Sequence, residues 1–333
     1  MTGVILAVDD LKVHFPVRTG GVLIGQYRPL KAVDGVSFDL KAGETLGIVG
    51  ESGCGKSTLG RAILQLVAPT GGTVSWLGKS FCDAGAADLH ALRREMQVVF
   101  QDPLASLDPR MTAGDIIAEP LWNFHGNLGR TEIDRRVREM MDKVGLLPAM
   151  INRYPHEFSG GQCQRIGVAR AMILKPKLVV CDEPVSALDV SIRAQVVNLL
   201  MALQREFGLA LIFISHDLAV VRHISHRVMV LYLGRVMELA DRDALYAMPR
   251  HPYTQALMAA IPIPDPDRER AKPRVILSGD PPSPLDPPSG CVFRTRCPHA
   301  TALCADQTPM LENTGADNKV ACHHWREMSP TSA

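Results

Sequence analysis

The sequence predicts an α/β fold that is organised around a phosphate-binding loop. Residues 50–58 read GESGCGKST and match the pattern G-x-x-x-x-G-K-[ST]. The apolar run before them, residues 44–49, is typical of a buried strand, and residues 59–67 have apolar positions at helical spacing. A further apolar strand, residues 177–182, ends in acidic residues. Strands that alternate with helices in this way indicate a mostly parallel sheet.

The loop is predicted to bind the phosphates of a nucleotide. Its glycines let the backbone fold back so that N–H groups point at phosphate oxygens, and the following helix adds its positive dipole end. Lys56 can reach the β- and γ-phosphates, and the Ser57 hydroxyl can coordinate Mg²⁺. The nucleotide-binding residues expected from this loop are Gly50, Ser52, Gly53, Cys54, Gly55, Lys56, Ser57 and Thr58.

Composition favours a cytosolic protein with more than one domain. The chain has 333 residues, of which 46% are apolar, enough for a sizeable core. With 36 basic and 35 acidic residues the net charge is +1, which gives no support for nucleic-acid binding. No run of 18 apolar residues occurs, so we expect no membrane span. Asp9, Asp10 and Lys12 interrupt the first apolar pattern, so the N-terminus does not read as a signal peptide.

The first hundred residues are predicted to be rich in strands. Residues 16–30 contain glycines and basic residues and are expected to form a loop, and residues 88–96 are expected to form a short helix. The predicted strands are residues 4–15, 31–40, 44–49, 71–78 and 97–102.

Helical patterns dominate residues 104–175, which we interpret as a helical subdomain inserted into the α/β core. Thr131 is expected to cap the middle helix of this block. The helices expected here are residues 112–121, 131–144 and 161–174. After this block the core resumes, with strands at 177–182 and 209–214, a helix at 192–207, two strands within 227–240 and helix at 243–261 except at its prolines.

Two acidic residues end the predicted strand at 177–182. Ligands of open α/β sheets bind at the carboxyl ends of strands, beside the phosphate loop. Asp182 is therefore placed to hold Mg²⁺, directly or through water. Glu183 can polarise an attacking water as a general base.

A second anion-binding helix start follows Phe158, in the run Ser159-Gly160-Gly161-Gln162. A serine in this position could also be a simple helix cap. Because the chain already has one phosphate loop, the second start indicates another nucleotide, or the same nucleotide held by a second subunit.

These motifs, in this order, resemble those of the ATP-binding-cassette (ABC) ATPases over residues 4–260. The shared features are the phosphate loop, Gln101 after a strand, the Ser-Gly-Gly-Gln run, the acid-ended strand, and the runs SALD at 186–189 and ISHD at 214–217. Further runs are similar to the ATP-binding subunits of oligopeptide/dipeptide permeases: AVDGVSF at 32–38, QDPLASL at 101–107, YPHEFS at 154–159, PVSALDV at 184–190 and HPYT at 251–254.

The resemblance assigns roles to individual residues. It implies that Gln101 senses Mg²⁺ and the γ-phosphate, so that Ser57, Gln101 and Asp182 are the expected Mg²⁺ ligands, and that His216 contacts the γ-phosphate. With Glu183, these give the expected catalytic set Glu183, His216 and Gln101. Phe15 matches the aromatic position that stacks on adenine, with Tyr27 as a rival. Residues expected to act across a dimer interface are Ser159, Gly160, Gly161, Gln162 and Asp189.

The same resemblance implies a fold, partners and a location. The fold would be a RecA-like core with an antiparallel β subdomain and an inserted helical subdomain. The partners would be a second ATPase subunit, two transmembrane permease subunits and an extracellular solute-binding protein. The chain would lie on the cytoplasmic face of the inner membrane and energise peptide import with ATP and Mg²⁺. The alternatives are the import of nickel or another small solute, and a soluble ABC ATPase that is not part of a transporter.

The C-terminal part is predicted to be a separate extension, so that residues 1–260 form the ATP-binding domain and residues 261–333 the extension. Nine prolines within residues 262–290 indicate a connector. Four cysteines then cluster: Cys291, Cys297, Cys304 and Cys322. Four thiolates suit Zn²⁺ or a 4Fe–4S cluster. The alternative is four free thiols in a packed cap. Arg294 and Arg296 are expected to be solvated surface residues. The extension resembles that of peptide-permease ATPases, some of which hold an iron–sulfur cluster.

Overall fold

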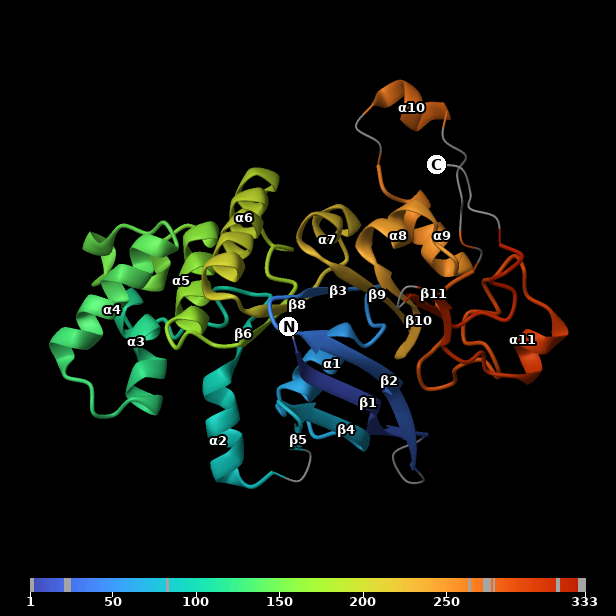
Figure 1. The fold of residues 1–333 in the computed structure, drawn as a ribbon, viewed down its shortest axis with the longest axis horizontal. Coiled ribbons are helices and arrows are strands. Elements are labelled where there is room, and N and C mark those ends of the chain that lie inside the picture. The colour runs from blue at the N-terminus through green and yellow to red at the C-terminus, as the bar shows by residue number, and fades with distance from the viewer. Residues whose placement is uncertain are drawn as a thin grey trace. The chain divides into compact units, whose positions relative to one another are not determined.

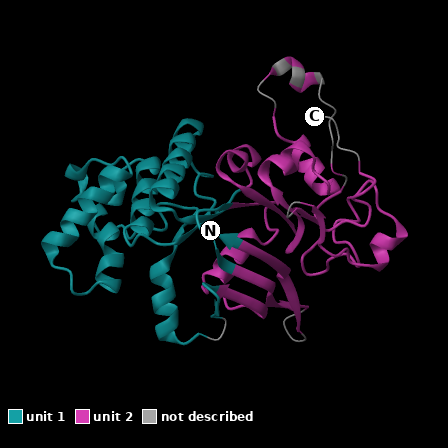
Figure 2. Ribbon diagram, viewed as in Figure 1, with its two compact units in different colours: residues 1–6, 40–45, 76–215 teal, residues 7–39, 46–75, 216–333 magenta. Residues whose placement is uncertain are grey.

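A computed structural model describes residues 3–20, 25–81, 84–262, 265–271, 277, 279–315 and 318–328. They form two compact units that interleave along the chain (Figure 2). Unit 1 comprises residues 1–6, 40–45 and 76–215, and unit 2 comprises residues 7–39, 46–75 and 216–333. Within the described ranges, no helix has the length and apolar character needed to cross a membrane. Parts of the predicted connector, at 263–264, 272–276 and 278, lie outside the described residues.

Unit 1 alternates strands with helices, as expected (Figure 1). Its elements are β5 (Lys79–Ser80), α2 (Ala86–Glu95), β6 (Met96–Val99), α3 (Ala113–Phe124), α4 (Arg130–Lys143), the 3₁₀ turns η1 (Pro148–Met150) and η2 (Pro155–Glu157), α5 (Gly160–Met172), β7 (Leu178–Asp182), α6 (Val190–Phe207) and β8 (Ala210–Ile214).

The strands of unit 1 form a parallel ladder. β6 pairs with β7 in the register Val99↔Cys181, and β7 pairs with β8 in the register Asp182↔Ile214. Every residue of β7 and β8 is buried, which explains why both read as continuous apolar runs. The carboxyl end of β7, where Asp182 lies, is the edge at which such sheets present functional groups.

Helices α3, α4 and α5 pack against one another within the predicted helical block (Figure 1). The predicted helices agree with them to within three residues at each end. The predicted Thr131 cap is wrong, because α4 begins one residue earlier, with Gly129 at its N-cap and no side-chain cap hydrogen bond. The first helix of this block, α3, does have a side-chain cap: Thr112 accepts a hydrogen bond from the Asp115 N–H at 3.2 Å.

Unit 2 contains most of the remaining strands and the C-terminal part of the chain. Its elements are β1 (Val4–Thr19), β2 (Gln26–Lys41), β3 (Thr45–Val49) and β4 (Gly71–Trp76), of which a few terminal residues belong to unit 1, then α1 (Lys56–Ile63), α7 (Leu218–Ile224), β9 (Arg227–Tyr232), β10 (Arg235–Asp241), α8 (Arg242–Ala247), α9 (Pro252–Ala259), α10 (Pro266–Ala271), α11 (Ala302–Asp306), β11 (Glu312–Gly315) and β12 (Asn318–Val320).

Two sheets organise unit 2. One has the strand order β2-β1-β4. In the other, β3 is parallel to β9, with Val49 opposite Val230, and β10 is antiparallel to both β9 and β12. The pairing of β10 with β12 ties the end of the chain to the sheet that supports the phosphate loop. Together the two units confirm the predicted α/β class, including its antiparallel β part.

One expectation about an irregular segment is wrong. Residues 16–19 and 26–30, predicted as loop, extend β1 and β2. These strand ends are exposed or half-buried, so backbone pairing holds them without any apolar signal in the sequence. The proline-rich connector also contains a short helix, α10, in which Pro266 is the first residue, where a missing N–H costs nothing.

Candidate functional site

The phosphate-binding loop lies in unit 2, between the fully buried strand β3 and helix α1. Gly50 has φ 153° and Gly55 has φ 103°. A Cβ atom on Gly50 would lie 2.2 Å from the Leu231 carbonyl oxygen, and one on Gly55 would lie 2.0 Å from the Ala32 carbonyl oxygen. Both positions therefore need glycine, for lack of space and because L side chains rarely adopt this φ.

Lys56 is the first residue of α1, and only 5% of it is exposed. Its ammonium donates hydrogen bonds to the carbonyl oxygens of Gly50 at 2.8 Å and Glu51 at 3.0 Å. The side chain is thus folded back along the loop, with its charge held beside the loop backbone. Cys54 is buried in the same loop, and burial raises the pKa of its thiol, although the nearby Lys56 acts to lower it. Cys54 is thereby kept as an inert part of the loop.

The two candidate adenine-stacking residues both lie in the β2-β1-β4 sheet of unit 2. Phe15, in β1, is 39% exposed, and Tyr27, in β2, is 71% exposed. Each presents a ring surface to solvent, so either can stack on a base, and the choice between them stays a prediction.

Two of the predicted catalytic residues meet in unit 1. Gln101 donates from Nε2 to Oε2 of Glu183 over 3.4 Å, and Asp182, at the end of β7, is 4% exposed. Glu183 has φ 47°, in a region that residues with a side chain seldom occupy. Hydrogen bonds fix this conformation: the Glu183 N–H donates to the Ile214 carbonyl, and the Ser186 hydroxyl donates to the Glu183 carbonyl. A strained acidic residue held in this way at a strand end is typical of a functional site.

The Ser-Gly-Gly-Gln run opens α5 in unit 1. The Ser159 hydroxyl accepts a hydrogen bond from the Gln162 N–H at 3.3 Å, and the Gln162 side chain accepts one from the Ser159 N–H at 3.0 Å. This reciprocal capping box confirms the helix start, with Ser159 and Gly160 exposed at its tip. Asp189 is the N-cap of α6, and Val190 beside it is 80% exposed.

The remaining predicted residues are divided between the units. Ser57 and His216 lie in unit 2, whereas Gln101 and Asp182 lie in unit 1. His216 is exposed and directly precedes Asp217, which caps α7 by accepting hydrogen bonds from the Ala219 and Val220 N–H groups.

The four C-terminal cysteines line one cavity of about 10 Å³, as does His299. Such a volume holds about one water molecule. Among the residues that the structure describes, no group of three or more His, Cys, Asp or Glu side chains could hold a metal ion. Burial raises the pKa of Cys297 and that of Cys322 to about 11. The structure therefore does not support the predicted iron–sulfur or zinc site.

Sequence reasoning missed the residues that surround Glu51. Arg296, expected at the surface, is 7% exposed and donates from Nη1 to Oε2 of Glu51 at 2.8 Å. The Glu51 N–H donates to the Tyr253 hydroxyl at 3.0 Å. Both contacts join residues more than 200 positions apart, which no local pattern in the sequence could have revealed. Arg294, the other arginine expected at the surface, is half-buried.

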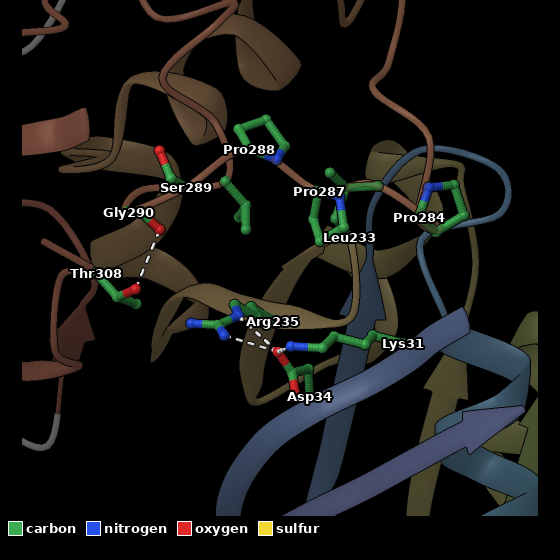
Figure 3. Close-up of a pocket in the computed structure, with 11 residues that line it drawn as sticks. Lys31, Asp34, Leu233, Arg235, Pro284, Pro287, Pro288, Ser289, Gly290 and Thr308 are labelled. Atoms are coloured by element: carbon green, nitrogen blue, oxygen red, sulfur yellow. Dashed lines mark hydrogen bonds and ion pairs between the residues drawn. The ribbon is translucent and has the colours of Figure 1, made fainter. Parts of the chain in front are cut away.

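A pocket of about 250 Å³ opens beside the turn between β9 and β10 (Figure 3). Lys31, Asp34 and Arg235 line one side of it, and Pro284, Pro287 and Pro288 line another. Its charged groups are paired with one another, because Asp34 Oδ2 lies 2.7 Å from Arg235 Nη2 and 3.6 Å from Lys31 Nζ.

Comparison with known proteins places this site in a family. The ABC transporter family model matches residues 33–186, and the model of the oligopeptide/dipeptide transporter C-terminal region matches residues 237–304. The chain is 62% identical to the oligopeptide transport ATP-binding proteins OppF of Salmonella typhimurium and of Escherichia coli, over 93% of this chain and 93% of each relative.

A solved structure is also similar. It is the dimeric post-hydrolysis state of the ATP-binding cassette MJ0796 bound to ADP and Pi, with a TM-score of 0.63 and 28% identity, over 71% of this chain and 98% of that chain. Because two curated relatives are this similar over nearly their whole length, the family is settled. The chain belongs to the ABC transporter family, among the ATP-binding proteins that carry the oligopeptide/dipeptide transporter C-terminal region.

Proposed function

We propose that this chain is the ATP-hydrolysing subunit that energises the import of oligopeptides or dipeptides through a membrane transporter. The observation that carries the hydrolysis is the contact between Gln101 and the strained Glu183 at the end of a buried strand. The cargo is supported by the relatives, which are named for oligopeptide transport, and by the matching C-terminal region.

Each predicted site residue has a distinct part in the proposed reaction. Glu183 orients the attacking water and accepts its proton, while Gln101 holds the Glu183 carboxylate in place. Lys56 and His216 offset the charge of the phosphates, and Phe15 or Tyr27 stacks on adenine. Positioning and electrostatic stabilisation of this kind account for most of the catalysis of phosphoryl transfer.

Bound Mg²⁺ would neutralise part of the phosphate charge, and the oxygen donors of Ser57, Gln101 and Asp182 fit the hard ligands that this ion prefers. The first lies at the start of α1, and the last ends β7. These three side chains are therefore our proposed magnesium ligands.

The proposed site is completed by a second ATP-binding subunit. The exposed tip of α5, with Ser159, Gly160, Gly161 and Gln162, presents N–H groups and a positive helix end to an anion. Asp189 and the exposed Val190 would lie at the same interface. In the full complex, two permease subunits and an extracellular solute-binding protein join the ATPase pair, which is peripheral to the cytoplasmic face of the inner membrane.

We also propose the domain boundaries. Residues 1–260 form the ATP-binding domain, which includes a helical subdomain at about 104–175, and residues 261–333 form the C-terminal extension.

The hydrolysis is tested with the purified full chain. Phosphate release from ATP should require Mg²⁺ and should disappear in Lys56→Ala, whereas Lys79→Ala, which changes an exposed lysine in β5, should leave the rate unchanged. Equal rates in wild type and Lys56→Ala would show that the loop is not the site.

Cargo and assembly are tested in membranes. The chain should co-purify with multi-span permease proteins and a second cassette, and ATP-driven uptake into vesicles should be competed by short peptides. Competition by Ni²⁺ instead would assign a metal-ion cargo. A chain that co-purifies with no membrane protein would favour an ABC ATPase outside a transporter.

A further inference from the structure

The C-terminal part of the chain reaches the first turn of the phosphate-binding loop. Arg296 Nη1 donates to Glu51 Oε2 at 2.8 Å, and the Glu51 N–H donates to the Tyr253 hydroxyl at 3.0 Å. One contact holds the side chain of Glu51 and the other holds its backbone. A single loop residue is thus fixed by two groups that follow it by more than 200 positions.

The two holding groups are themselves rigidly placed. Tyr253 is fully buried, and its ring packs against Tyr232 at 4.7 Å and Phe293 at 5.3 Å between centroids. The Arg296 guanidinium lies 5.9 Å from the centroid of the Tyr232 ring, and its Nη1 is 3.4 Å from the Tyr232 hydroxyl. Side chains packed in such a cluster move little, because the interior is close to crystal density.

Glu51 also contacts Lys56, the lysine of the phosphate-binding loop. Lys56 Nζ donates to the Glu51 carbonyl at 3.0 Å and to the Gly50 carbonyl at 2.8 Å. A continuous path of polar contacts therefore runs from Arg296 through Glu51 to Lys56. A shift of Glu51 would change both the course of the loop and the position of the ammonium.

We propose that Arg296 is a positioning residue for the phosphate-binding loop, and that with Tyr253 it holds Glu51 so that the loop is ordered before nucleotide arrives. This inference rests on the proposed nucleotide binding by residues 50–58. Its physical basis is preorganisation, because a loop that is already ordered loses less entropy on binding. Through Arg296 and Glu51, the extension thereby becomes part of the nucleotide site.

The first test compares Arg296→Met with wild type as full chains. We expect the Kd for ATP to rise about tenfold, the effect of losing one charge-assisted hydrogen bond. Amide hydrogen exchange in residues 46–58 of the nucleotide-free protein should also become faster. The matched control is Arg326→Met, because Arg326 pairs with Glu312 at 3.3 Å in the same C-terminal segment but is 72% exposed. That control should match wild type in both measurements.

A double-mutant cycle isolates the ion pair. If Arg296 acts through Glu51, Glu51→Gln combined with Arg296→Met should weaken ATP binding no more than Arg296→Met alone. Additive losses would show that the two residues act separately and would overturn the proposal. Unfolding midpoints are measured for every variant, and Arg296→Lys replaces Arg296→Met if the latter does not fold, since the lysine keeps the charge but loses the planar fork.

The outcomes separate this inference from the proposed function. If wild type binds ATP and Lys56→Ala does not, the loop is the nucleotide site. Arg296 variants that then fold, bind ATP like wild type and leave the exchange of residues 46–58 unchanged would overturn the inference alone. If wild type does not bind ATP, the proposed function fails, and the exchange measurement still decides whether Arg296 orders the loop.

Discussion

Gln101 and Glu183 lie in contact, with 3.4 Å between Nε2 of the first and Oε2 of the second. Gln101 follows β6 and Glu183 follows β7, so the pairing of two neighbouring parallel strands brings their carboxyl ends to one edge. The amide N–H of Gln101 donates to the carboxylate of Glu183 and orients it. We therefore expect the rate of ATP hydrolysis to depend on both side chains.

Replacement of Glu183 by Gln should stop hydrolysis and leave ATP binding intact, because the amide keeps the size of the side chain but cannot accept a proton. We expect turnover to fall at least a hundredfold, the usual effect of losing a general base. A stable ATP-bound dimer should appear in size-exclusion chromatography with ATP. Glu206→Gln, which changes an exposed glutamate that pairs with Lys143, is the control. Turnover near the wild-type rate in Glu183→Gln would remove Glu183 as the base.

Ser159 is expected to have two separable roles. Ser159→Ala removes the cap of α5 and should lower the free energy of unfolding by about 1 kcal/mol, whereas Ser159→Gly should cost only a few tenths. Both variants remove the hydroxyl, so both should lose ATP-dependent dimerisation. Urea unfolding and light scattering with ATP measure the two effects. Dimerisation that survives in Ser159→Gly would leave Ser159 with the capping role alone.

Asp34 should stabilise the fold in a pH-dependent way. Burial acts to raise the pKa of this carboxyl, but its contacts with Arg235, Lys31 and His14 prevail and hold the pKa below the usual 3.8. Because the unfolded state then binds more protons as the pH falls, the stabilisation is complete above pH 3.8 and is lost below it. Asp34→Asn should cost about 2 kcal/mol at neutral pH.

The measurement for Asp34 is urea unfolding of wild type and Asp34→Asn between pH 7 and pH 3. The difference between them should stay constant down to about pH 4 and shrink below it. A difference that grows on acidification would contradict the sign of this pKa shift.

Two loop glycines should respond differently to alanine. A Cβ on Gly53, at φ 77°, would have open space around it, so Gly53→Ala should cost about 1–2 kcal/mol of backbone strain. A Cβ on Gly55 would overlap the Ala32 carbonyl oxygen at 2.0 Å, so Gly55→Ala should lower the urea midpoint further and abolish ATP binding. Equal midpoints for the two variants would show that the loop relaxes around the added methyl group.

The sequence allowed the α/β class and the elements around the phosphate loop to be predicted because their signals are local. β7 and β8 are buried along their whole length and read as apolar runs, and Gly50 and Gly55 are needed by the backbone itself. The ends of β1 and β2 were missed because they are exposed and therefore carry no apolar pattern.

The environment of Arg296 could not be predicted, because it depends on contacts between distant segments. The sequence places Arg296 between a threonine and a cysteine in a polar stretch, which is typical of a surface, yet Glu51 and Tyr232 bury it. The four cysteines show the opposite case. Their clustering was expected, and they do line one cavity, but among the described residues no group of three or more His, Cys, Asp or Glu side chains could hold a metal ion, which sequence spacing alone does not reveal.

The buried ring of Phe293 lies 5.3 Å from those of both Tyr232 and Tyr253. A chain shortened to residue 260 would keep the two tyrosines and lose the phenylalanine that shields them, leaving aromatic surface in contact with water. Exposed apolar patches of this kind promote aggregation. We therefore expect a chain cut at residue 260, where the ATPase motifs end, to be more prone to aggregation than the full chain.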